Sequence, residues 1–325
     1  MGDGGHCLLS EGAAPALRME TLRTMKPAPL KLASLALAAS AVALSYMALA
    51  DTEASEPAPA ATVTVAEAKA DPANWRKVDP QNLFIFDTTK GRILIEAFPD
   101  VAPKHYAQFA AIIRSGDFDG TSFHRVIEGF MDQGGDIFAL KGRESGLPDI
   151  PGEFTFRRDP VALPLDSTIG PEDTAHFGYI KGFPVATQAS FFAEMSVDGM
   201  VESFIPHCRG IVSTARTDDP NSANSQFFLM RDQAEHLDRK YTAWGRVVQG
   251  VDVVLAIKHG PDARDGLVDN PDILKTATVA ADLPAAERPE VWVERTDGPL
   301  FRASIADKDD VDVCSLPPVP AVVSK

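Results

Sequence analysis

The chain has 325 residues, of which 45% are hydrophobic and 24% are charged. This balance is that of a globular protein and excludes a wholly disordered chain and a multi-span membrane protein, while the length allows one large domain or two ordinary ones. The formal net charge of −15 repels phosphate backbones, so the composition argues against nucleic-acid binding.

The N-terminal region has the pattern of an export signal. Residues 32–50 are uncharged and alanine-rich, and a small-x-small motif ends at Ala50. This pattern predicts a signal peptide over residues 1–50, with Met25 as an alternative start. We therefore expect an exported protein, periplasmic in a Gram-negative source and free of the membrane after cleavage. The alternative is an inner-membrane anchor formed by residues 32–50, since a run of this length nearly spans a bilayer.

The segment after the signal is rich in Ala, Pro, Glu and Thr, and it predicts a flexible linker over residues 51–80. Cleavage would leave Cys208 and Cys314 as the cysteines of the mature chain. In an oxidising compartment the two could form a disulfide. Two free thiols are the alternative, because the sequence does not show whether their Cα atoms lie within disulfide reach.

Regular structure is predicted to begin with a β-hairpin. The apolar runs 83–86 and 92–96 flank a turn that ends in Gly91. A helix follows from Pro103 to Gly116, with one apolar face at i, i+3, i+4, i+7 spacing that consists of Tyr106, Phe109, Ala110 and Ile113.

The remaining chain shows many short apolar runs and a second helix pattern over 251–257. The runs cover residues 122–127, 129–131, 211–215, 226–230, 243–248 and 276–281. This pattern favours a closed antiparallel barrel over a parallel α/β sheet. Residues 137–209 lack a clean period and predict an insert that either folds on its own or serves a function. Residues 284–325 form a C-terminal extension with one β-like run at 291–294.

Three blocks carry a resemblance to a known family. Residues 123–136 read FHRVIEGFMDQGGD, and the family pattern is FHRVI-x-GFM-x-QGGD. Residues 211–229 contain IVSTART, DPNSA and SQFFL, and residues 237–250 contain LDRKYT and WGRVVQG. The chain thus resembles the cyclophilin family of peptidyl-prolyl isomerases over about residues 83–282, apart from most of the insert.

The resemblance implies a mainly β fold, an eight-stranded antiparallel barrel capped by two helices. We place this isomerase domain at residues 81–283, interrupted by the long insert. The resemblance also implies peptidyl-prolyl cis–trans isomerase activity (EC 5.2.1.8). It assigns catalysis to Arg125, Phe130 and Gln133. It assigns substrate binding to Met131, Ala215, Arg216, Gln226, Phe228, His236, Leu237 and Tyr241. His236 stands where animal members often carry tryptophan, so we expect weak cyclosporin sensitivity.

The chemistry needs no cofactor. Amide resonance sets a barrier of roughly 18–20 kcal/mol to X–Pro rotation, while the two isomers differ by only about 0.5–1 kcal/mol. A catalyst must therefore bind the twisted amide better than either planar form. Arg125 suits this task because its guanidinium is always charged and offers five N–H donors.

We expect the partners to be proline-containing peptides and unfolded or folding exported proteins, acted on by a monomer. The alternative is a peptide-binding or chaperone module on the same fold with little isomerase activity. A metal enzyme is not predicted, because the histidines are scattered and the acidic residues near 307–312 lack an EF-hand pattern.

Overall fold

The computed structural model describes residues 63–309 and 311–324. The predicted signal peptide, the alternative start at Met25, the alternative anchor and linker residues 51–62 lie outside this part of the chain. Within the described residues, no helix has the length and apolar character needed to cross a membrane.

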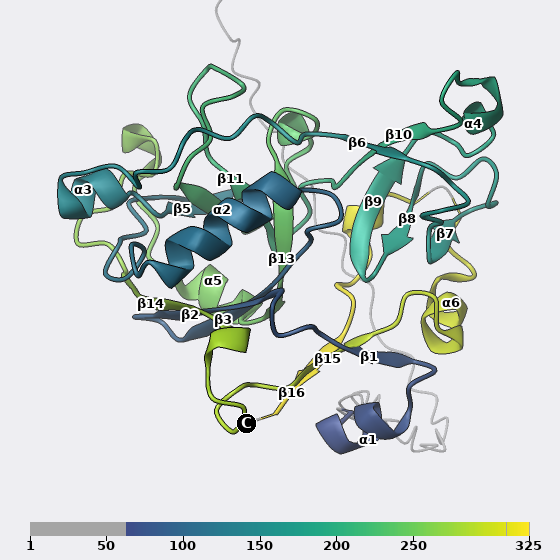
Figure 1. Ribbon diagram of the computed structural model, residues 1–325, viewed down its shortest axis with the longest axis horizontal. Helices are drawn as coiled ribbons and strands as arrows, with labels where there is room; N and C mark the ends of the chain where they lie inside the picture. Colours follow the sequence, from purple (N-terminus) through teal and green to yellow (C-terminus); the bar gives the residue numbers. More distant parts are fainter. Residues whose placement is uncertain (1–62, 310, 325) are drawn as a thin grey trace, which may run out of the picture. The chain divides into compact units, whose positions relative to one another are not determined.

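The central element is an eight-stranded antiparallel sheet (Figure 1). In spatial order its strands are β14 (Leu274–Val279), β2 (Leu83–Thr88), β3 (Arg92–Ala97), β13 (Ala243–Gln249), β11 (Ile211–Thr214), β12 (Phe227–Met230), β5 (Met131–Gly134) and β4 (Arg125–Ile127). Isolated bridges Ser122–Ile273 and Arg125–Leu267 connect the β4 edge to the segment that leads into β14. The curled sheet agrees with the predicted eight-stranded antiparallel barrel.

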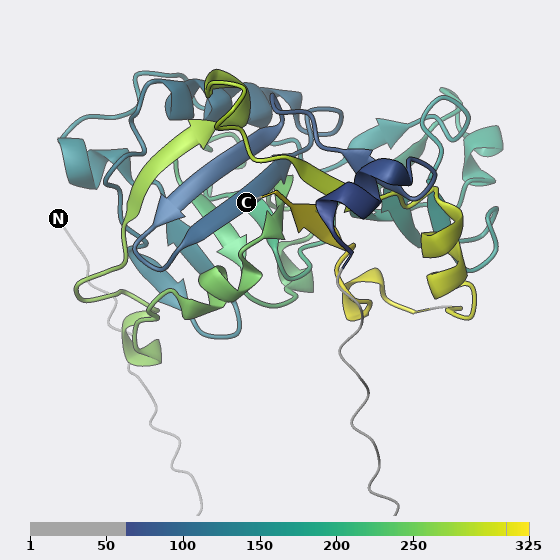
Figure 2. The same cartoon turned by 90° about the horizontal axis from the view of Figure 1, so that it is seen from below.

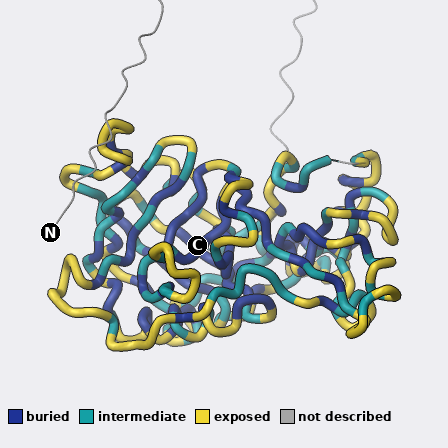
Figure 3. Tube along the Cα trace, turned by 90° about the horizontal axis from the view of Figure 1, so that it is seen from above, coloured by how far each residue is buried: buried dark blue, intermediate teal, exposed yellow. Residues whose placement is uncertain are grey.

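The predicted hairpin and both predicted helices are present. Strands β2 and β3 pair through a turn in which the Thr88 N–H donates to the Gly91 carbonyl. Helix α2 (Pro103–Arg114) buries Phe109 against the barrel, where its ring stacks on Trp244 with 4.5 Å between centroids. Helix α5 (Val251–Ala256) lies near β3. Buried residues run through the barrel strands, shown dark blue in Figure 3.

The insert folds into a second sheet, so residues 137–209 have a structure of their own. Its five antiparallel strands follow the order β6 (Phe156–Arg158), β10 (Val201–Phe204), β9 (Phe183–Thr187), β8 (Phe177–Ile180) and β7 (Ser167–Ile169). The insert also contains two short helices. Helix α4 (Phe192–Met195) lies near the second sheet, whereas α3 (Ile137–Lys141) lies beside α2 (Figure 1). The strands are only three to five residues long, which explains why no long period is visible in the sequence.

The C-terminal extension pairs with residues that precede the barrel (Figure 2). Strand β15 (Val291–Glu294), predicted from the sequence, lies between β1 (Trp75–Lys77) and β16 (Ala321–Val323). Helix α6 (Pro299–Ile305) follows β15, and α1 (Val65–Ala70) precedes β1. The linker prediction is therefore wrong for residues 64–77. A Thr64–Glu67 capping box starts α1, and Trp75 is buried.

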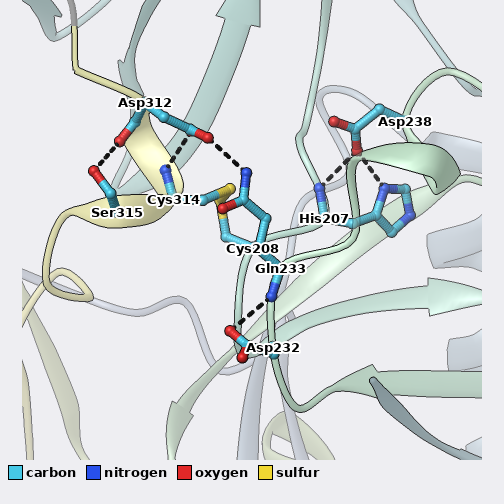
Figure 4. Close-up of a disulfide and its surroundings, with 8 residues drawn as sticks. All are labelled: His207, Cys208, Asp232, Gln233, Asp238, Asp312, Cys314 and Ser315. Carbon is cyan, nitrogen blue, oxygen red and sulfur yellow. Dashed lines mark hydrogen bonds and ion pairs between the residues drawn. A yellow bond between two sulfur atoms is a disulfide. The ribbon is translucent and has the colours of Figure 1, made fainter. Parts of the chain in front are cut away.

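Ion pairs and a disulfide connect the barrel to the segment before it and the insert to the extension. Glu96 on β3 accepts hydrogen bonds from Arg76 on β1 and Arg246 on β13, at 2.6 and 2.9 Å. The Cys208–Cys314 disulfide links the end of the insert to the extension, with Cα atoms 4.9 Å apart (Figure 4). The question of paired or free thiols is thus resolved in favour of the pair. These contacts make the insert and extension integral parts of the fold.

Candidate active site

A chain of three polar side chains crosses neighbouring strands of the barrel. Arg125 on β4 lies opposite Gln133 on β5, and its Nη1 donates to Gln133 Oε1 at 3.2 Å. Gln133 Nε2 in turn donates to Gln226 Oε1 at 2.8 Å. Antiparallel register places these side chains next to each other, since directly opposed residues project on the same face of a sheet. The chain of bonds fixes the guanidinium and both amides relative to each other.

Asp265 holds Arg125 from the side opposite to Gln133. Arg125 Nη2 lies 3.0 Å from Asp265 Oδ1, and Arg125 Nε lies 3.1 Å from Oδ2 and from the backbone carbonyl of Asp265. Asp265 adopts a left-handed φ of 52° directly after the 3-10 helix Asp262–Arg264. The Arg125 hydrogen bonds lower the pKa of the Asp265 carboxyl, so this partner stays ionised.

The predicted apolar residues form an aromatic cluster beside this polar chain. We use this name for Phe130, Met131, Phe228, His236, Leu237 and Tyr241. The rings of Phe130 and His236 lie 5.3 Å apart, and those of Phe228 and Tyr241 meet edge to face at 5.8 Å. Met131, Phe228 and Leu237 are buried, whereas Phe130 and Tyr241 are partly exposed and His236 is exposed. The partly exposed rings leave apolar surface available to a ligand.

The two remaining predicted residues, Ala215 and Arg216, directly follow β11, which ends at Thr214. The Ala215 N–H donates to the Gln226 carbonyl at 2.8 Å. The Arg216 guanidinium lies over the Tyr241 ring at 4.5 Å and faces Phe154 at 5.6 Å. Arg216 is thus held between an aromatic residue of the barrel and one of the insert.

Three residues at this site were missed by the sequence analysis. Asp265 and Phe154 lie outside the motif blocks, and only tertiary structure brings them to Arg125 and Arg216. His207, at the end of the insert, stacks on Phe228 at 6.1 Å and is held by Asp238, which accepts from both its backbone N–H and its ring Nδ1 (Figure 4). The sequence gives only the residue type at these three positions, because each contacts residues that are far away along the chain.

The insert reaches the site through its first segment. The Ile150 N–H donates to the Ala223 carbonyl at 2.7 Å, and the Glu153 N–H donates to Thr242 Oγ1 at 2.9 Å. The Glu153 carboxylate also contacts the ring of buried His105 in α2. These contacts place Phe154 where it meets Arg216.

His124 precedes Arg125, and burial lowers the pKa of its imidazole. No group of three or more His, Cys, Asp or Glu side chains within residues 63–309 and 311–324 is arranged to hold a metal ion. What the site offers is a fixed cation, two oriented amides and an apolar surface, which suits binding a polarised amide.

Fold and site together define a β-barrel protein built to bind peptide, with an arginine donor beside an apolar cluster. Residues 83–279 match the family model "Cyclophilin type peptidyl-prolyl cis-trans isomerase/CLD", and the chain belongs to this family. It is a peptidyl-prolyl cis–trans isomerase of the cyclophilin type, EC 5.2.1.8.

Named relatives agree with this assignment. The "probable peptidyl-prolyl cis-trans isomerase" of Brucella abortus (strain 2308) is 36% identical over 208 residues, which cover 63% of this chain and 85% of the relative. Isomerase cyp18 of Streptomyces antibioticus is 31% identical over 180 residues, 53% of this chain and 80% of the relative. The crystal structure of cyclophilin AquaCyp293 from Hirschia baltica is similar at 49% identity and a TM-score of 0.76, covering 80% of this chain and 97% of that one.

Proposed function

We propose that this isomerase accelerates X–Pro rotation in exported proteins as they fold, acting as a monomer in the periplasm. Uncatalysed X–Pro isomerisation takes tens of seconds, which is slow enough to limit folding. The clients would be unfolded or partly folded chains that present proline in an accessible segment.

Arg125 would supply the decisive interaction. When the X–Pro bond twists, resonance is lost and the proline nitrogen becomes a hydrogen-bond acceptor. The Arg125 guanidinium has five N–H donors, and some of them bind Asp265 and Gln133. The others remain for this nitrogen or for the prolyl carbonyl. A contact of this kind is stronger in the twisted state than in the planar ones, and only such a difference accelerates the reaction.

The other predicted residues would hold the peptide on both sides of the rotating bond. The aromatic cluster would bind the proline ring, with Phe130 as its most direct contact. Gln133 and Gln226 would hydrogen-bond to the peptide backbone, and Ala215 and Arg216 would contact residues before the proline. The observation that carries this proposal is the continuous Arg125–Gln133–Gln226 chain next to the cluster.

The Cys208–Cys314 disulfide supports the proposed location. Structural disulfides form and persist in oxidising compartments, and the periplasm is one. The test is to express the full chain in a Gram-negative host and fractionate the cells. We expect a periplasmic protein that begins at Asp51. Retention in the membrane would favour the anchor over residues 32–50, and an uncleaved cytoplasmic protein would contradict export.

The folding role has its own test. A client whose refolding is limited by an X–Pro bond should refold faster with catalytic amounts of the enzyme. The Arg125→Ala variant should lose this effect. If the enzyme slows aggregation without changing the slow refolding phase, the protein acts as a binding or chaperone module instead.

A further inference from the structure

A cavity of about 600 Å³ lies between the insert and the C-terminal extension. Strand β6, the segment around β7 and the end of helix α6 line it, and Figure 1 shows β7 and α6 as neighbours. It shares no lining residue with the candidate active site. Its volume falls in the range of about 300–1,000 Å³ that is typical of small-molecule sites.

One wall of the cavity carries a buried cation that forms no ion pair with any residue of the described part of the chain. Arg158 on β6 is only 2% exposed. Its guanidinium donates to Ser203 Oγ, the Leu163 carbonyl and Thr187 Oγ1, at 3.1–3.3 Å. All three acceptors are neutral oxygens. Within residues 63–309 and 311–324, no carboxylate oxygen lies within 4.0 Å of this guanidinium.

The environment of Arg158 favours an added anion. Three of its five N–H groups are engaged, so two have no partner among the described residues. Burial lowers its pKa, and only the nearby Asp159 carboxylate opposes this effect. A buried charge that is not paired is costly, so an anionic ligand at this wall would be stabilising. Ser167, also in the lining, has a buried hydroxyl with no partner in the described part of the chain.

The exposed part of the lining carries charges of both signs. Arg302 donates to the Asp166 carbonyl at 2.8 Å. Among the described residues Arg302, Glu172 and Asp309 form no ion pair, whereas Asp307 and Lys308 pair with each other. The Asp166 carboxylate already accepts hydrogen bonds from Lys181 and Thr296. Glu172 and Asp309 would repel a purely anionic ligand such as phosphate, but they would attract an ammonium group.

We propose that this cavity binds a short peptide with free ends. The peptide carboxylate would contact the Arg158 wall, and its ammonium group would lie near Glu172 and Asp309. The site is separate from the isomerase site and does not depend on the function proposed for it.

Calorimetric titration of the full, disulfide-bonded chain tests this proposal with three probes. Trialanine carries both charges, N-acetyl-trialanine lacks the ammonium, and trialanine amide lacks the carboxylate. None contains proline, so none is a substrate of the isomerase. We expect trialanine to bind about tenfold or more tightly than either blocked form, the effect of losing one charged contact. Equal binding of all three, tighter binding of inorganic phosphate, or no binding at millimolar concentration would overturn the proposal.

Variants connect each end of the peptide to its side chains. The double variant with Glu172→Gln and Asp309→Asn should bind trialanine more weakly, with no change in its binding of N-acetyl-trialanine. Both residues are exposed, so folding should be retained. The Arg158→Gln variant should bind trialanine more weakly, with no change in its binding of trialanine amide. Asp252→Asn, an exposed carboxylate on α5, is the matched control and should change nothing. If the Glu172 and Asp309 double variant loses affinity for trialanine and for N-acetyl-trialanine equally, or loses affinity for neither, the proposed orientation is wrong.

Discussion

The Arg125 guanidinium and the Asp265 carboxylate form a two-point ion pair, with Nη2–Oδ1 at 3.0 Å and Nε–Oδ2 at 3.1 Å. Arg125 comes from the first motif block and Asp265 from the loop before β14, 140 residues later. With Nε and Nη2 held by Asp265, Arg125 Nη1 donates to Gln133 Oε1. Asp265 is therefore a positioning residue for the donor that we assign to catalysis.

Replacing Asp265 should lower turnover without abolishing peptide binding. Asp265→Asn keeps an oxygen acceptor but loses the charge, so Arg125 becomes less ordered. Because the carboxylate side chain is 75% exposed, we expect kcat/KM to fall by only about two- to fivefold, mostly through kcat. Asp262→Asn, an exposed carboxylate in the same loop, is the control. A variant with wild-type kcat would show that Gln133 alone orients the arginine.

Phe154 should influence which residue is accepted before proline. Its ring and that of Tyr241 hold Arg216. Phe154→Ala removes apolar surface from this side, so kcat/KM for a Phe-Pro peptide should fall by about three- to tenfold, and for a Gly-Pro peptide by less. Phe192→Ala, an exposed ring elsewhere in the insert, serves as the control. An equal loss on both peptides would assign Phe154 a purely structural role.

The disulfide should contribute strongly to stability. It closes a loop with a sequence separation of 106 residues and ties the extension to the insert. The variant with Cys208→Ser and Cys314→Ser should lose about 2–5 kcal/mol of unfolding free energy. Urea denaturation measures this loss, and reductant should destabilise the wild type but not the variant. Equal midpoints for the two oxidised proteins would contradict the prediction.

Acid should weaken the contact between the end of α3 and the segment that follows α2. Hydrogen bonds from Arg143 and Lys141 lower the pKa of Asp117 to about 2. The folded pKa lies below the unfolded value, so this contribution is present above about pH 4 and is lost as the pH falls toward 2. Arg143 is half exposed, which limits the effect to about 1 kcal/mol.

The Asp117→Asn variant should therefore show a flatter loss of stability between pH 4 and pH 2 than the wild type. Asp218→Asn, an exposed carboxylate outside the ion pairs of the described residues, should keep the wild-type slope. Identical acid profiles for the wild type and Asp117→Asn would rule out the contribution.

The features that could be predicted from the sequence are those encoded by a local apolar pattern or by a motif. Strands 83–88 and 291–294 are apolar runs, and Arg125 and Gln133 lie in one motif, so these features were found. Strand β1 was missed because it has only three residues and pairs with β15 more than 200 residues later. The Asp265 and Phe154 contacts likewise depend on long-range folding. A short strand or a lone side chain carries no periodicity from which such a partner could be inferred.

The most direct test of the account is the exchange rate of a short Ala-Pro-Phe peptide, measured by NMR with residues 51–325 and with their Arg125→Ala variant. We expect fast cis–trans exchange with the first. With the variant the rate should fall about a hundredfold or more, the usual effect of removing a donor aimed at the transition state. A variant as active as the parent would contradict the central claim that Arg125 stabilises the twisted amide.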